Sequence, residues 1–138
     1  MNAYLEELEK TGNSLMVYKG GALLFQSSSK GIRPHLEAIN QLGEGIRGSI
    51  MVDKIVGRAA ALLILYSEAA EAHAAVISTP GKRVLEMHGL KFTYLEETDH
   101  IKMQDGQIFC PFEAMVQGIT DPKEGYRVIV EKMRSLKD

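Results

Sequence analysis

The first residues that suggest chemistry lie in the stretch 48–65. Residues 50–52 are apolar and predict a short buried strand, whereas the residues from Lys54 onward favour a helix. Asp53 stands at the junction, where its carboxylate could cap the first amides of that helix. Lys54 and Arg58 are four residues apart, a spacing that places both on one helical face. Two cations near a helix N-terminus indicate a bound anion or an ion pair with Asp53; the alternative is a capped core helix with two solvated basic residues.

Cys110 is the one cysteine of the chain, and its neighbours are informative. Pro111 follows it and Glu113 lies three positions on, which is the spacing of a helix N-cap, N1 and N3. A thiol at a helix N-terminus tends toward the thiolate, which is the nucleophilic and oxidisable form. Glu113 opposes this by like charge, unless it accepts the proton or caps the backbone. Cys110 is therefore expected to be a nucleophile or redox residue, or else a small buried hydrophobic residue.

Other polar residues could join the same site. The charge of Lys54 could hold a phosphate, a carboxylate or a developing oxyanion, or its amine could act as a base or nucleophile. Ser78 and Thr79 precede Pro80 and open another helix, where their hydroxyls either line the same rim or serve as plain caps. His73, in an expected strand, is expected to be structural.

The remaining pattern predicts the elements that position these side chains. Helices are expected at residues 1–10, 33–42, from 54, 80–88, and after 110 and 121, and strands at 14–18, 22–26, 50–52, 72–77 and 92–96. A hairpin followed by strand–helix–strand–helix–strand predicts a mixed sheet covered by helices. Ligands of such sheets lie beyond the carboxyl ends of the strands, at helix N-termini, where Asp53 and Lys54 are expected.

Composition narrows the function classes. A chain of 138 residues fits one domain, 1–138, with a sizeable core. The net charge of −2, with no basic run and no Trp, predicts no nucleic-acid partner. The longest apolar run, residues 59–66, covers about two helical turns, so no membrane span is expected. One cysteine excludes an internal disulfide and a Cys-rich metal site, and the acidic N-terminus is unlike a signal peptide, which favours a cytoplasmic protein.

The order of elements resembles the cytidine deaminase-like fold: helix, hairpin, helix, strand, helix, strand, helix, strand, helix. In zinc deaminases the helix after the hairpin carries H-x-E, and the helix after the third strand carries P-C-x-x-C. The first place holds His35-Leu36-Glu37, and the second holds residues 53–57, so that Lys54 and Gly57 fill the two cysteine positions. A catalytic zinc keeps three protein ligands, and only His35 remains. A zinc deaminase is therefore not expected, and the simpler interpretation makes His35 a surface residue of an amphipathic helix.

Over essentially its whole length, the chain also resembles an uncharacterised prokaryotic family, the domain of unknown function 1893. The marks of that family here are residues 30–34, 53–61 and 110–113, followed by Asp121-Pro122. The resemblance implies an α/β, cytidine deaminase-like three-layer fold with a mixed five-stranded sheet flanked by helices. It implies no zinc site and no established reaction. One member of the wider fold, the formyltransferase of purine synthesis, also works without a metal.

Two functions from different classes follow from these residues. The first is a small-molecule-binding protein for an anionic or nucleotide-like ligand, either as a binder alone or as a metal-independent and cofactor-free enzyme. Its candidate catalytic residues are Cys110, Lys54 and Asp53, and its candidate ligand-binding residues are Arg58, Ser78, Glu113, His35 and Glu37. The alternative is a non-catalytic binding or regulatory module of the same fold, with an inert Cys110; a zinc hydrolase is a distant third. A homodimer is an expectation by analogy with the fold alone.

Overall fold

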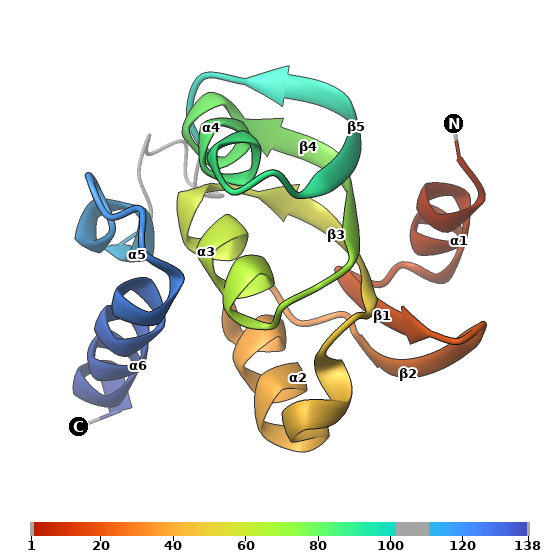
Figure 1. Ribbon diagram of the computed structural model, residues 1–138, viewed down its shortest axis with the longest axis horizontal. Helices are drawn as coiled ribbons and strands as arrows, with labels where there is room; N and C mark the ends of the chain where they lie inside the picture. Colours follow the sequence, from red (N-terminus) through yellow and green to blue (C-terminus); the bar gives the residue numbers. More distant parts are fainter. Residues whose placement is uncertain (1, 102–110, 138) are drawn as a thin grey trace.

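A mixed five-stranded sheet forms the centre of the protein (Figure 1). The computed structural model describes residues 2–101 and 111–137. The strands are β1 (Leu15–Lys19), β2 (Ala22–Ser27), β3 (Ile50–Val56), β4 (Glu71–Ser78) and β5 (Lys91–Thr98). They lie in the order β2-β1-β3-β4-β5; β1 runs antiparallel to both of its neighbours, and β3, β4 and β5 are parallel. The predicted α/β class and mixed sheet are thereby confirmed.

Helices cover both faces of this sheet. They are α1 (Ala3–Thr11), α2 (Arg33–Leu42), the 3-10 turn η1 (Gly43–Ile46), α3 (Arg58–Tyr66), α4 (Thr79–Met87), α5 (Pro111–Met115) and α6 (Pro122–Lys137). Among the described helices, α1 packs on one face, against β3 and β4, whereas α2, α3 and α4 lie on the other face (Figure 1). Helices α5 and α6 pack on the outer side of α3. None of the helices in the described ranges is long and apolar enough to cross a membrane.

Strand β3 is longer than the sequence predicts, and this moves Asp53 and Lys54 out of the helix. Asp53 is the register partner of Leu15 in β1 and of Ala74 in β4. The backbone N–H of Lys54 donates to the carbonyl oxygen of Ser14 at 2.9 Å. Neighbours on both sides thus satisfy the backbone in an extended conformation, and this pairing outweighs the helix propensity of Lys54. The predicted helix start at Lys54 is wrong.

Helix α3 begins instead at Arg58, with Gly57 in extended conformation as its N-cap. Its residues 59–64 are all buried, because β3 lies beneath it and α6 packs above it. The approach of α6 is close: a Cβ atom at Gly125 would stand 2.8 Å from Leu62 Cδ1. This packing fixes the N-terminus of α3 beside the ends of β3 and β4, where the candidate site lies.

Candidate functional site

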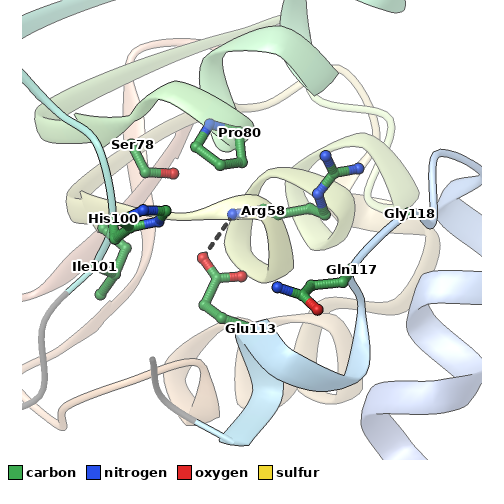
Figure 2. Close-up of a pocket in the computed structure, with 8 residues that line it drawn as sticks. All are labelled: Arg58, Ser78, Pro80, His100, Ile101, Glu113, Gln117 and Gly118. Carbon is green, nitrogen blue, oxygen red and sulfur yellow. Dashed lines mark hydrogen bonds between the residues drawn. The ribbon is translucent and has the colours of Figure 1, made fainter. Parts of the chain in front are cut away.

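A cavity of about 150 Å³ lies where β4 ends and where α3 and α4 begin (Figure 2). Its lining residues come from several elements: Arg58, Ser78, Pro80, His100, Ile101, Glu113, Gln117 and Gly118. This is the edge of the sheet at which parallel α/β folds usually hold ligands. The sequence prediction of where a site would lie therefore agrees with the cavity, although most of its lining residues are not those first expected there.

Glu113, from α5, places its carboxylate on the N-terminus of α3 (Figure 2). The backbone N–H of Arg58 donates to Oε1 at 2.7 Å, and that of Ala59 donates to Oε2 at 2.9 Å. These two amides have no partner within the helix, and the positive end of the helix dipole favours a carboxylate there. Glu113 thus caps a helix that lies 54 to 55 positions away in the sequence.

Burial raises the pKa of the Glu113 carboxyl above its ordinary value. The hydrogen bonds from the amides of Ala59 and Arg58, and the charge of Arg58, lower that pKa but do not cancel the effect of burial. A carboxyl group with a raised pKa can hold or release a proton nearer to neutral pH than an exposed one. Glu113 is therefore a candidate for acid–base chemistry in the cavity, which His100 also lines.

Arg58 and Ser78, two of the predicted ligand-binding residues, line this cavity together with Glu113. The hydroxyl of Ser78, which is 1% exposed, accepts the backbone N–H of Gly81 at 3.0 Å and caps α4. The predicted cap is thereby confirmed, and Ser78 also lines the cavity. The guanidinium of Arg58 donates through Nη1 to the carbonyl oxygen of Ile119 at 2.9 Å, which ties α3 to the segment before α6.

His35 and Asp53 form a buried pair that does not line the cavity. The distance from His35 Nε2 to Asp53 Oδ2 is 2.6 Å, and the residues are 1% and 6% exposed. Within the described part of the chain, His35 Nδ1 has no hydrogen-bond partner. Two expectations are thereby wrong: His35 is not a surface residue, because α2 turns it toward β3, and Asp53 does not cap α3, because its carboxylate faces His35.

The other sequence candidates lie apart from the cavity or outside the description. Lys54 is exposed in β3, so it shares no helical face with Arg58, and that prediction is wrong. Glu37 is exposed on α2. Neither Lys54 nor Glu37 lines the cavity. The proposed match of Lys54 to a deaminase cysteine fails for the same reason, since that cysteine begins a helix. Cys110 lies outside the described residues, so its predicted cap and its role as nucleophile stay predictions.

Two polar cavity residues, His100 and Gln117, were not among the predicted site residues. His100 follows β5, which is parallel to β4. Because ligands of parallel sheets bind beyond the carboxyl ends of the strands, a His at this position could have been predicted as a site residue. Gln117 follows α5 and had no such signal, because its position depends on how α5 packs against α3. In the described part of the chain, no group of three or more His, Cys, Asp or Glu residues could hold a metal ion.

Comparisons with known proteins identify one family. A solved structure from Thermotoga maritima, titled as a DUF1893 family protein (TM1506), superposes with a TM-score of 0.85 at 32% sequence identity. The match covers 96% of this chain and 92% of that chain. The comparison with curated proteins finds no match. The family model described as TM1506, domain of unknown function (DUF1893), matches residues 3–133. The chain belongs to the DUF1893 family.

Proposed function

We propose that this protein binds a small polar ring compound of the nucleobase or nucleotide type in the cavity, with Glu113 as its hydrogen-bond and proton partner. The observation that carries the proposal is a buried carboxyl group with a raised pKa in a cavity at the N-termini of two helices. Pockets for drug-sized ligands hold about 300–1,000 Å³. A cavity of about 150 Å³ suits the single ring of a base, so the sugar and phosphate of a nucleotide would extend beyond it.

The lining chemistry supports this ligand class. Glu113 can accept N–H groups from the edge of a base when it is ionised, and can donate to a ring nitrogen or carbonyl oxygen when it is protonated. The hydroxyl of Ser78 adds a second polar group to the lining of the cavity. Arg58 supplies the positive charge that an attached phosphate or carboxylate would need. The ligand is therefore polar at the ring and anionic on the side of Arg58.

We further propose that the fold is cytidine deaminase-like. The observed order of helices and strands supports the relationship, because it runs helix, hairpin, helix, strand, helix, strand, helix, strand, helix. Zinc deaminases place their cysteines at the N-terminus of the corresponding helix. Here α3 begins with Arg58 followed by alanines, and the backbone N–H groups of Arg58 and Ala59 donate to the carboxylate of Glu113. We therefore propose a metal-independent site that relies on Glu113 for proton transfer.

The roles of Cys110 and Lys54 remain part of the proposal, with Cys110 as nucleophile or redox residue and Lys54 as its electrostatic partner. A cation near a thiol favours the thiolate. If the two residues share a site, Lys54→Met shifts the pH dependence of Cys110 alkylation to higher pH. The same pH dependence in both proteins would remove Lys54 from the site and leave Glu113 as the acid–base residue.

A non-catalytic binding or regulatory module is the alternative, and one observation favours it. The carboxylate of Glu113 already satisfies the first two amides of α3, which is the role of a structural cap. In that case the cavity binds a ligand without transforming it, or Glu113 only holds α5 on α3.

Titration calorimetry with cytosine, uracil and uridine monophosphate tests whether the cavity binds this class of ligand or whether Glu113 only holds α5 on α3. Glu113→Gln keeps the shape of the side chain but cannot ionise, and we expect it to weaken binding of all three probes at least tenfold. Arg58→Met should weaken binding of the monophosphate alone. Arg127→Met removes the same charge from an exposed position that does not line the cavity, so it is the matched control. Binding that none of these variants changes, or no binding of any probe, would overturn the proposed ligand class.

A further inference from the structure

A second cluster of polar side chains lies at the opposite end of β4 from the cavity. Glu71 is the first residue of β4, whereas Ser78, the last, lines the cavity. His73 Nε2 is 2.7 Å from Glu71 Oε2, and His73 Nδ1 is 2.6 Å from Thr93 Oγ1. His73 and Thr93 are register partners in the parallel strands β4 and β5. Carboxylate, imidazole and hydroxyl therefore form one continuous relay.

Asn2 donates a hydrogen bond to this relay. Its Oδ1 accepts the backbone N–H of Leu5 at 2.8 Å and caps α1, so its amide nitrogen faces the sheet. That nitrogen donates to Thr93 Oγ1 at 3.1 Å and also lies 3.1 Å from His73 Nδ1. An amide NH₂ group is only a donor, so this second contact agrees with a His73 tautomer in which Nδ1 is unprotonated.

The hydroxyl proton of Thr93 can then point to His73. The carboxylate of Glu71 accepts from Nε2–H of His73, which sets the tautomer with a free lone pair on Nδ1. Nδ1 has one lone pair, so with Asn2 donating to Thr93 Oγ1 that lone pair can accept the hydroxyl proton of Thr93 across 2.6 Å. This is the arrangement of a nucleophile, a base and a group that orients the base.

We propose that Thr93 is the nucleophile of an acyl-transfer site, with His73 as its general base and Glu71 as the residue that orients His73. Burial matches these roles: His73 is 6% exposed, whereas Thr93 is exposed and open to a substrate. The ring of Tyr4 stacks on the imidazole, with centroids 5.1 Å apart and planes 17° apart, and shields one face of it from water. The second oxygen of Glu71 lies 3.8 Å from Lys91 Nζ.

The substrate class is a carboxylic ester or thioester. Thr93 Oγ1 bonds to the carbonyl carbon while its proton passes to His73 Nδ1, and the bond to the leaving alcohol or thiol breaks as that group takes up the proton. Water then attacks the acyl-threonine ester with the same base and restores the hydroxyl. The amide of Asn2, a neutral donor beside Oγ1, suits the single oxyanion of an acyl intermediate. A phosphoryl group would need cations, and the nearby Lys91 faces Glu71.

Reaction with p-nitrophenyl acetate tests this site in the full-length protein. We expect release of p-nitrophenolate and an acetyl group that peptide mass spectrometry locates on Thr93. Thr93→Val should abolish this acetylation, and Thr93→Ser should retain it. The matched control is Thr79→Val, because the hydroxyl of Thr79 donates to a Glu97 carboxylate at 2.9 Å without any imidazole. Acetylation only on lysines, or the same rate in Thr93→Val as in the wild type, would overturn the proposal.

Variants of the other two residues separate a base from a simple hydrogen bond. General base catalysis contributes about 10²–10⁴-fold, so His73→Gln should lower the acetylation rate of Thr93 by about that factor. Glu71→Gln should lower it less, because it leaves the imidazole in place. An unchanged rate in a folded His73→Gln protein contradicts the proposed base. Because His73 is buried, His73→Gln could fail to fold. Thr93 is exposed, so Thr93→Val and Thr93→Ser then test the proposal on their own.

Discussion

Glu113 lies so close to Gly57 that a Cβ atom on residue 57 would stand 1.7 Å from Glu113 Oε1. No side chain fits in that space, so the carboxylate reaches the first amides of α3 only because position 57 is a glycine. The contact joins α5 to the turn between β3 and α3, which are distant in sequence. The same contact places the carboxyl group in the cavity, so one close approach supports both packing and the proposed chemistry.

The first prediction follows from this contact. Gly57→Ala forces Glu113 away from α3, and overpacking of this kind destabilises a protein by about 1–3 kcal/mol. Urea unfolding of the two proteins gives the difference. Gly45→Ala is the control, because a Cβ atom at Gly45 meets nothing within 4 Å and its φ is not positive. A Gly57→Ala protein as stable as Gly45→Ala would mean that Glu113 is not held against the turn.

A double-mutant cycle tests the same contact more directly. In a Glu113→Ala background there is no carboxylate to displace, so Gly57→Ala should cost less than it does in the wild type. Residues in direct contact show coupling energies of about 0.5–3 kcal/mol. We expect coupling in this range from the free energies of unfolding of the four proteins, whereas additive costs would place the two residues out of contact.

The second prediction concerns pH. Because burial raises the pKa of Glu113 in the folded protein, the folded state holds this proton more tightly than the unfolded state does. The free energy of unfolding should therefore fall as the pH rises from the ordinary carboxyl pKa through the raised one. The Glu113→Gln variant lacks this titratable carboxyl group. Its free energy of unfolding relative to that of the wild type should therefore rise with pH over that window. A difference between the two proteins that stays constant with pH would show that the pKa of Glu113 is not raised.

Local signals in the sequence predicted much of the fold. The hairpin, β4 and the cap at Ser78 each depend on residues close to one another in the chain, such as the two glycines at the turn or Pro80 after Ser78. Strand β3 was predicted too short, because its last residues are held extended by β1 and β4, which no local pattern records. The error moved the start of α3 and, with it, the roles of Asp53 and Lys54.

The residues of the candidate site likewise include some that local sequence signals predicted and some that depend on tertiary packing. Arg58, Ser78 and Glu113 were predicted as ligand-binding residues because each stands near the start of a helix, and the cavity brings all three together. The pairing of His35 with Asp53 could not be predicted, because it depends on how α2 lies against β3. The relay through Glu71 and His73 was missed for a related reason, since it requires the register of β4 against β5.

A third prediction concerns the buried pair. Asp53→Ala leaves the imidazole of His35 buried without its partner, and a buried polar group left without a hydrogen bond costs about 1–3 kcal/mol. The double variant His35→Leu with Asp53→Leu should recover part of the loss, because no polar group is then stranded. Thermal and urea unfolding measure both effects, and a loss below about 1 kcal/mol for Asp53→Ala would contradict a pair that is buried.

The last prediction concerns zinc. A catalytic zinc needs three protein ligands, and His35, the one ligand expected from the deaminase pattern, directs Nε2 at Asp53. The first turn of α3 begins Arg58-Ala59-Ala60-Ala61, which offers no thiolate. Protein purified without chelator should therefore contain far less than one zinc per chain, and a chelator should leave its melting temperature unchanged. Near-stoichiometric zinc that is lost in His35→Ala would contradict this prediction and would return His35 to the role of a metal ligand. Zinc that persists in His35→Ala would instead indicate a site away from the pair, and it would equally contradict a metal-independent protein.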